Sequence, residues 1–399
     1  MPSLILGLLI LAAATPREQF EALKAEYEAR TADWDRQYLG GDKPIEESKV
    51  DHVGRLRDWP AWSYAPRFLA FAEAHPGDPA GVAALFWVAD LIGAVGDRDR
   101  ALVPIIARSL DRIAASHVDD PRVDALCRTI AFSGAMPSSE GFLRSASEKA
   151  KDRAVRGRAG LGLARLLEGR REQALSPWFD RPSRSKHQEL AIELTDPAYF
   201  AGIRAVDPKS LMVEVDREFA RVAKEYGDVV ADSRPGRDRT IAEVVETELF
   251  EVRHLGLGQV APEIEGRDSD DTPFKLSDYR GKVVVLTFSG NWCGPCVGMY
   301  PGERDLARRL KDRPFAILSV NTDEDKETLR RSIKAGEVTW RCWWDGAIDG
   351  PICTAWNVRS FPTVYVLDAK GVIREKQLRG EQLDAAVEKL VAETAAARP

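Results

Sequence analysis

Three short runs of apolar and β-branched residues in the last third of the chain limit its fold more than any other feature. The runs are residues 283–288, 315–320 and 363–367. Continuous apolar runs of this length are typical of strands that are buried on both faces of a sheet. Helical patterns at about residues 295–311, 325–335 and 382–396 alternate with them. The sequence therefore predicts an α/β domain over residues 258–396.

Residues 16–255 have a different pattern, with apolar residues three and four positions apart and breaks at Gly, Pro and Asp clusters. This spacing predicts a mainly α-helical region in front of the α/β domain. The expected helices lie at about residues 62–75, 79–95, 99–116, 120–133, 138–150, 153–168, 209–226 and 239–253. Leu255 to Gly258 is the expected linker between the two parts.

Two segments in the helical region have the form His-x-x-Asp-Pro. They begin at His75 and His117, an offset of 42 residues that is the size of a two-helix repeat. Two copies favour a repeat-like array, and the alternative is an irregular helical bundle without repeats. Residues 176–208 hold four prolines and a charged stretch, so we expect a long loop there.

The beginning of the chain has the pattern of an export signal. Residues 4–14 are apolar, and Ala12 to Ala14 supply the small residues that a signal peptidase needs. The run is too short to cross a bilayer, which takes ~20 residues, and no later stretch is apolar enough to do so. We expect residues 1–14 to be a signal peptide and the protein to lie in the periplasm or cell envelope. A cytoplasmic protein with an apolar first helix is the alternative.

Composition excludes several classes of protein. Lys and Arg total 57 against 63 Asp and Glu, a net charge of −6, so no overall basic excess is available to bind nucleic acid. Five cysteines are too few for a disulfide-stapled scaffold of 399 residues. The five histidines show no spacing typical of metal ligands. We expect no metal, no bound cofactor and no stable membrane span.

The motif Trp292-Cys293-Gly294-Pro295-Cys296 directly follows the first predicted strand and opens a predicted helix. Unpaired N–H groups and the positive end of the helix dipole stabilise a thiolate there and lower a cysteine pKa from ~8.5 toward ~7. Cys293, outside the helix proper, is therefore expected to be the exposed nucleophile. Cys296, one turn into the helix, is expected to attack the mixed disulfide and release the partner. Pro295 is compatible with the first helical turn, where its missing N–H has no partner.

Pro362 opens the third predicted strand, where a proline costs a ladder hydrogen bond unless the backbone turns tightly. A cis Phe361–Pro362 bond is the expected arrangement, and an ordinary trans proline is the alternative. The backbone polar groups of Phe361 would then pair with an extended substrate segment opposite Cys293. Trp292 and Phe361 would supply an apolar docking surface, so we expect Trp292, Phe361 and Pro362 to bind substrate.

These motifs identify a resemblance. The W-C-G-P-C motif, the lead-in segments 261–264 and 274–283, Pro301 in the predicted helix and Phe361-Pro362-Thr363 are together similar to thioredoxin-fold thiol-disulfide oxidoreductases of the TlpA/ResA type. The resemblance covers about a third of the chain and implies a thioredoxin-like domain with a redox-active disulfide between Cys293 and Cys296. It also implies partner proteins that carry disulfides or thiols.

Two positions depart from the family pattern. Thioredoxins carry a buried acid six residues before the first cysteine, where this chain has Thr287, and TlpA/ResA-like proteins often carry a glutamate where this chain has Met299. Both acids that would accept a proton from Cys296 are therefore absent from their usual places. Glu303 lies further along the same helix, and because glutamate is rarely buried we expect it to be a solvated surface residue.

The remaining cysteines have simpler interpretations. Cys342 and Cys353 flank a loop rich in turn residues, so a structural disulfide between them is expected if the chain is exported, with two buried thiols as the alternative. Zinc bound by these two together with Cys293 and Cys296 is a weaker alternative, because their spacing is unlike that of a zinc knuckle. Cys127 lies on an apolar helical face and is expected in the core.

The sequence thus predicts an enzyme, a thiol-disulfide oxidoreductase that uses a Cys293/Cys296 dithiol. Reduction of disulfides in exported proteins is the favoured direction, because the Gly-Pro dipeptide resembles that of reducing thioredoxins. Such a cycle needs a separate electron donor, located at the membrane if the chain is exported. The alternative is a helical binding or scaffold protein whose CGPC pair is a redox sensor or a structural disulfide.

Overall fold

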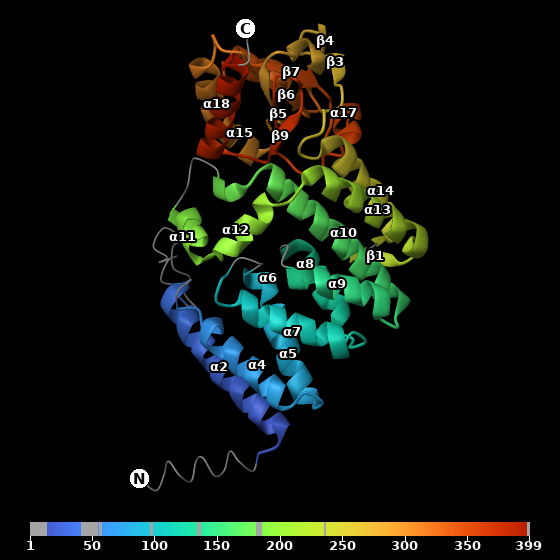
Figure 1. Ribbon diagram of the computed structural model, residues 1–399. Helices are drawn as coiled ribbons and strands as arrows, with labels where there is room; N and C mark the ends of the chain where they lie inside the picture. The colour runs from blue at the N-terminus through green and yellow to red at the C-terminus, as the bar shows by residue number, and fades with distance from the viewer. Residues whose placement is uncertain are drawn as a thin grey trace. The chain divides into compact units, whose positions relative to one another are not determined.

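The computed structural model describes residues 14–40, 55, 58–95, 99–133, 137–180, 186–234 and 237–396. The chain forms two compact units (Figure 1). The N-terminal unit contains residues 1–171 and 185–245, and the C-terminal unit contains residues 172–184 and 246–399. The expected signal peptide lies outside the described residues except for Ala14. Among the described residues, no helix is long and apolar enough to cross a membrane.

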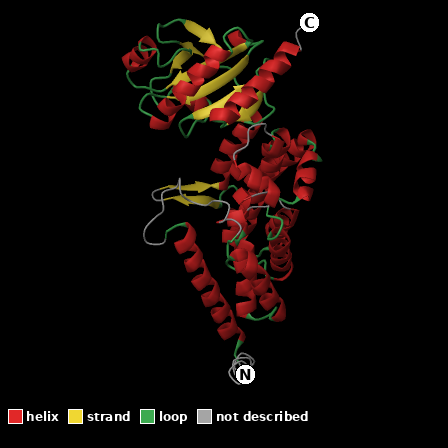
Figure 2. Ribbon diagram, turned by 90° about the vertical axis from the view of Figure 1, so that its left-hand side faces the viewer, coloured by secondary structure: helices red, strands yellow, loops and turns green. Residues whose placement is uncertain are grey.

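The N-terminal unit is helical, as the residue pattern predicts (Figure 2). Its only sheet among the described residues is the antiparallel pair β1 (Val230–Arg234) and β2 (Arg237–Thr240). Its helices are α2 (Pro16–Tyr38), α4 (Ala61–Ala74), α5 (Pro79–Asp90), α6 (Ile92–Val95), α7 (Val103–Ser116), α8 (Val123–Ser133), α9 (Pro137–Lys149), α10 (Arg153–Leu175), α11 (Lys186–Leu194), α12 (Pro197–Arg204), α13 (Pro208–Tyr226) and α14 (Ile241–Phe250).

The two His-x-x-Asp-Pro segments form the same turn. His75 and His117 are the C-cap residues of α4 and α7, and the backbone carbonyl of each accepts a hydrogen bond from the Asp three residues on, at 3.2 and 3.0 Å. Asp78 then caps α5 by accepting from the N–H of Ala80 at 2.8 Å. Both segments therefore connect one helix to the next, and a repeat-like array of such pairs stays a prediction.

The expectation of a long loop over residues 176–208 is wrong for much of its length. The described part of this segment contains a short 3₁₀ turn, η2 (Trp178–Asp180), and the helices α11 and α12. Two of its prolines start helices: Asp196 caps α12 ahead of Pro197, and Asp207 caps α13 ahead of Pro208. Proline is tolerated at these first helical positions because its missing N–H would have no partner there.

The C-terminal unit is built around a five-stranded sheet in the order β7-β6-β5-β8-β9. The three central strands are those expected from the apolar runs. Strands β5, β6 and β7 are parallel, whereas β8 and β9 run antiparallel to β5 and β8, respectively. The strands are β5 (Val283–Ser289), β6 (Phe315–Asn321), β7 (Arg341–Trp344), β8 (Thr363–Leu367) and β9 (Ile373–Lys376), with β3 (Glu265–Arg267) and β4 (Pro273–Lys275) forming a separate hairpin.

Alternate residues of β5 enter different cores, as the period of a strand requires. Val283 and Val285 pack in a cluster with apolar residues of α15 (Gly294–Arg309), α16 (Lys326–Lys334) and α18 (Gly380–Ala396). Figure 1 shows α15 and α18 together over the sheet. Val284 and Leu286 enter a second cluster with residues 255–276 and α17 (Pro351–Ala355). Burial on both faces explains why β5 lacks polar alternation.

The C-terminal unit begins earlier than the sequence indicates. The expected linker, Leu255 to Gly258, is instead part of this unit, because Leu255 and Leu257 are buried in the second cluster. The N–H of Gly258 also donates to the carbonyl of Ile373 in β9 at 2.8 Å. A π-helical turn at Glu251–Leu255 connects α14 to this segment. Because Leu255 and Leu257 pack against the sheet, this segment is not a free linker.

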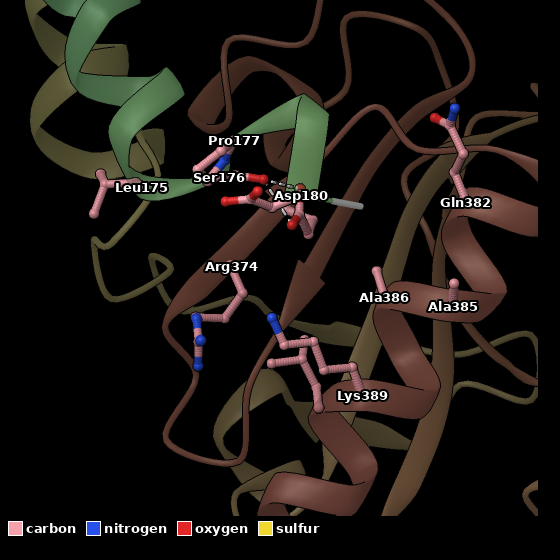
Figure 3. Close-up of a pocket in the computed structure, with 11 residues that line it drawn as sticks. Leu175, Ser176, Pro177, Asp180, Arg374, Gln382, Ala385, Ala386 and Lys389 are labelled. Atoms are coloured by element: carbon pink, nitrogen blue, oxygen red, sulfur yellow. Dashed lines mark hydrogen bonds between the residues drawn. The ribbon is translucent and has the colours of Figure 1, made fainter. Parts of the chain in front are cut away.

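A second segment, residues 172–180, also belongs to the C-terminal unit. Glu172 forms an ion pair with Lys376 of β9 at 2.9 Å, and Ser176 Oγ donates to Glu375 at 2.7 Å. A pocket with a volume of about 110 Å³ is lined by residues of this segment, β9 and α18. Figure 3 shows its lining residues. No cysteine lines the pocket, so it is separate from the redox motif.

Candidate active site

Cys293 and Cys296 form a disulfide at the beginning of α15. Cys293 is the N-cap residue, and its Sγ accepts a hydrogen bond from the N–H of Cys296 at 3.2 Å. The side chains are 4% and 1% exposed, so the expectation of a freely exposed Cys293 is wrong for the disulfide form. Cys293 nevertheless keeps the larger exposed fraction, because it precedes the helix whereas Cys296 faces the sheet below it.

The loop that carries the motif is held by a buried carboxylate. Asp323, just after β6, accepts hydrogen bonds from the backbone N–H and the Nδ2 of Asn291, at 2.8 and 2.7 Å. Asn321 Nδ2 donates to the same carboxylate at 2.8 Å, and Ser332 Oγ donates to Asn291 Oδ1 at 3.0 Å. Asp323 is 4% exposed, so these donors replace the water that a buried charge loses. The carboxylate therefore fixes the position of residue 291, two residues before Cys293.

Trp292 lies at the surface next to the disulfide. It is 55% exposed, its Nε1 donates to Thr322 Oγ1 at 3.1 Å, and its ring meets Phe361 edge-on with 5.3 Å between centroids. A β-carbon on Gly290 would lie 2.3 Å from the Trp292 Nε1, so only glycine lets the indole approach the backbone this closely. Trp292 and Phe361, which we expect to form an apolar docking surface, thus have their rings in direct contact.

The Phe361–Pro362 peptide bond is cis, as the sequence indicates. Both residues are half-buried at the start of β8. The carbonyl of Pro362 accepts a hydrogen bond from an Nη of Arg379 at 2.6 Å. This hydrogen bond connects the proline loop to Arg379, the residue directly before α18. This arginine has no signal in the sequence, because its partner is a backbone carbonyl 17 positions away.

The polar groups beneath the motif are neutral. Thr287 in β5 hydrogen-bonds to Ser319 of β6, with 3.1 Å between the two hydroxyl oxygens, and the Nε1 of Trp340 donates to the same Ser319 at 2.5 Å. Both hydroxyl residues are 2% exposed. The position where thioredoxins carry a buried acid is therefore filled by a satisfied hydroxyl pair, which cannot take a proton from Cys296.

Glu303 is buried, and the expectation of a solvated side chain is wrong. It is 4% exposed and lies on the buried face of α15 with Cys296 and Tyr300. Burial raises its pKa from 4.5 to about 7, and the charge of Arg379 opposes this rise. Two helical turns separate Glu303 from Cys296, ~10 Å along the axis, which is too far for a direct hydrogen bond. The spacing of Cys296, Tyr300 and Glu303 by four and three residues was the available signal of a common buried face.

Cys342 and Cys353 are free thiols, so the expected disulfide between them is wrong. Cys342 packs with α15 and α18 on one face of the sheet, and Cys353 packs with residues 255–276 on the other. Burial raises the pKa of Cys342 to about 12. The sheet also keeps the two thiols apart as zinc ligands, and no group of three or more metal-ligating side chains occurs in the described ranges. Cys127 is buried in the N-terminal unit, as expected.

The fold and the cysteine site together define a thioredoxin-like domain with a redox-active pair at a helix N-terminus. The AhpC/TSA family model matches residues 257–376. The chain is 31% identical over 121 residues to the thiol-disulfide oxidoreductase ResA of Geobacillus kaustophilus, covering 30% of this chain and 68% of that protein. It is 33% identical over 119 residues to the thioredoxin-like protein YneN of Bacillus subtilis, covering 30% and 69%.

Among solved structures, the thioredoxin domain of a thiol-disulfide oxidoreductase from Bacteroides vulgatus shares 29% identity. It covers 34% of this chain and 98% of that domain, with a TM-score of 0.32. The chain belongs to the ResA family of thiol-disulfide oxidoreductases, within the thioredoxin-like fold. The relatives match only the C-terminal third, so they say nothing of the helical unit.

Replacing Glu303 with Gln should remove a specific pH dependence of stability. The pKa of Glu303 is about 7 in the folded chain against 4.5 ordinarily, so between these values the folded chain holds a proton that the unfolded chain has released. The free energy of unfolding therefore falls as pH rises through this window, by on the order of 3 kcal/mol. Hydrogen exchange of the β5 amides, corrected for intrinsic rates, measures this fall in the C-terminal unit.

Glu337→Gln is the matched control, because Glu337 is exposed on the loop before β7. It should keep the pH dependence of the parent, whereas E303Q should lose most of it. Equal slopes for the parent and E303Q would contradict a buried Glu303 that is protonated near neutral pH.

Proposed function

We propose that this protein reduces disulfide bonds in other proteins, with Cys293 as the attacking thiolate and Cys296 as the resolving thiol. The observation that carries the proposal is the hydrogen bond from the Cys296 N–H to Cys293 Sγ at the N-cap of α15. In the reduced pair the same N–H and the helix dipole favour a thiolate on Cys293 over one on Cys296. Cys293 precedes the helix, whereas Cys296 lies on its buried face, which supports Cys293 as the sulfur that a partner reaches.

The reaction is two thiol-disulfide exchanges. The Cys293 thiolate attacks one sulfur of the substrate disulfide, an S–S bond forms between them, and the other substrate sulfur leaves as a thiolate that takes up a proton. Cys296 then loses its proton and attacks Cys293 Sγ, which releases the second substrate thiol. The substrate gains two electrons and two protons, and the protein ends with the Cys293–Cys296 disulfide. A dithiol of another protein must reduce this disulfide before the next turnover.

We infer that substrate binds across the cysteines between Trp292 and the proline loop. The exposed indole and the Phe361 ring form an apolar surface beside Cys293. Pro362 directly precedes β8, and its carbonyl already accepts a hydrogen bond from Arg379, so the loop is held in place before substrate arrives. An extended segment of substrate would pair with the backbone of Phe361 and rest its side chains on Trp292.

We further propose that the protein is exported and works in the periplasm or cell envelope. The support is the apolar run of residues 4–14 with small residues at its end. Disulfides in substrates persist in such an oxidising compartment. A cycle of reduction there needs an electron donor that carries electrons across the membrane to this protein.

Substitution of each cysteine tests the assignment of roles. With dithiothreitol as reductant, the parent should catalyse the reduction of insulin, and Cys293→Ser should abolish catalysis because no attacking thiolate remains. Reduced Cys296→Ser, mixed with insulin after dithiothreitol has been removed, should instead accumulate a mixed disulfide with the substrate, since Cys293 still attacks but no other thiol resolves the product. Insulin turbidity and non-reducing mass spectrometry measure the two outcomes.

Cys127→Ala is the control, because it removes a thiol from the N-terminal unit and should leave turnover unchanged. Mixed disulfide on Cys296 in the Cys293→Ser variant would reverse the assigned roles. An inactive parent would favour a binding protein whose cysteine pair only senses redox state.

The reduction potential of the pair tests the direction of the reaction. A reductant like thioredoxin has a potential near ~−270 mV, and a strong oxidant has one near ~−120 mV. We expect a value close to the first, measured by equilibration with glutathione redox buffers and alkylation of free thiols. A value close to the second would make the protein an oxidant of thiols.

Cell fractionation and the intact mass of the purified protein test export. The protein from the envelope fraction should lack the residues up to about Ala14, because cleavage follows the small residues that end the apolar run. A variant with Leu8→Arg and Leu9→Arg breaks that run and should stay in the cytoplasm uncleaved. A parent protein with its N-terminus intact in the cytoplasmic fraction would refute export.

A further inference from the structure

A groove next to the disulfide is not used by the reaction itself. Its volume is about 650 Å³, and Asn291 and Trp292 of the motif loop form one wall. Ala347, Ile348 and Asp349, which precede α17, also line it. The groove therefore includes Trp292, the residue directly before Cys293.

Two exposed apolar side chains mark the groove as a surface for a partner. Trp292 is 55% exposed and Ile348 is 56% exposed, and both line it. Large apolar side chains exposed together beside a reactive group are typical of binding surfaces. Since Trp292 lies between the groove and Phe361, a segment that rests on its indole can reach both.

The rim of the groove is acidic. Glu324, Asp325 and Asp349 line it and are exposed, and no Lys or Arg is among the described lining residues. Among the described residues, the cation paired with Asp325 is the guanidinium of Arg331, at 3.8 Å. Glu324 and Asp349 form no ion pair within the described part of the chain. The rim thus keeps negative charge that is open to a cationic partner.

We propose that this groove binds the segment of a substrate protein that flanks its reactive cysteine, and that it selects segments carrying Lys or Arg beside an apolar residue. The inference rests on the proposed function, because it places the substrate cysteine at Cys293. The apolar residue lies against Trp292 and Ile348, while the cation lies between Glu324 and Asp349. Charge complementarity of this kind raises the rate of encounter and disfavours anionic partners.

Matched peptides test the inference. Three disulfide-bonded peptides are compared that differ only in Lys, Gln or Glu next to one cysteine, together with an uncharged small disulfide. At low ionic strength the kcat/KM of the parent should be about tenfold higher for the Lys peptide than for the Glu peptide. The ratio should fall toward one in high salt, because exposed charges are screened.

Variants of the rim locate the effect. The double variant E324Q/D349N should lower the Lys-to-Glu ratio below about threefold, and E324K/D349K should invert it in favour of the Glu peptide. Both kcat/KM values are measured on the same preparation of each variant, so a loss of folded protein lowers both equally and leaves their ratio unchanged. D312N/E393Q removes the same charge at the other end of the unit, beyond the C-terminus of α15 and late in α18, and should keep the ratio of the parent.

Two outcomes would overturn the inference: a ratio near one in the parent, or a ratio that E324K/D349K leaves unchanged. Both require that the parent reduces the peptides. If the parent reduces neither the peptides nor the uncharged disulfide, the proposed function itself fails, and this result is distinct from a loss of selectivity.

Discussion

The active site depends on one buried carboxylate. Asp323 follows β6, the strand parallel to β5, and binds the backbone and side chain of Asn291, which follows β5. Because parallel strands end at the same edge of a sheet, their following loops lie side by side there. The hydrogen bonds from Asn291 to the Asp323 carboxylate hold the two loops at a fixed distance. The disulfide, the Trp292 indole and the acidic groove are all placed relative to this link.

The sequence predicted the elements that have a strong local signal. Central strands β5, β6 and β8 and helix α15 appear where apolar runs and the CGPC motif place them. The edge strand β7 was not expected, because Arg341 to Trp344 is only four residues long and follows no alternation. The prolines of residues 176–208 favour a loop in the sequence, so helices α11 and α12 are not expected there, although Pro197 occupies a first helical position.

The wrong predictions for site residues have a different cause. Glu303 was expected at the surface because of its residue type, yet the sheet and α18 cover the face of α15 on which it lies. Cys342 and Cys353 were expected to pair because they are near in sequence, yet they face opposite sides of the sheet. The spacing of Glu303 from Cys296 and Tyr300 is a signal of a common buried face, whereas the separation of the two thiols depends on tertiary packing, which their nearness in sequence does not encode. Asp323 had a weak signal, an acid directly after a buried strand.

The site differs from the thioredoxin pattern in where it keeps its acid. Thr287 and Ser319 fill the usual position with hydroxyls, while Glu303 lies two helical turns below Cys296 and near the charge of Arg379. The carboxyl is thus held away from the sulfurs, and Arg379, whose charge opposes the rise of its pKa, donates a hydrogen bond to the carbonyl of Pro362.

The segment of residues 172–180 makes the redox unit discontinuous along the chain. Its contacts with Glu375 and Lys376 cover part of β9, the last strand of the sheet. A fragment cut once, ahead of α14 or at Leu255, would lose these side-chain contacts and leave Glu375 and Lys376 without their partners in this segment. Grafting the catalytic portion onto a different carrier therefore requires two pieces of polypeptide, one on either side of residues 185–245.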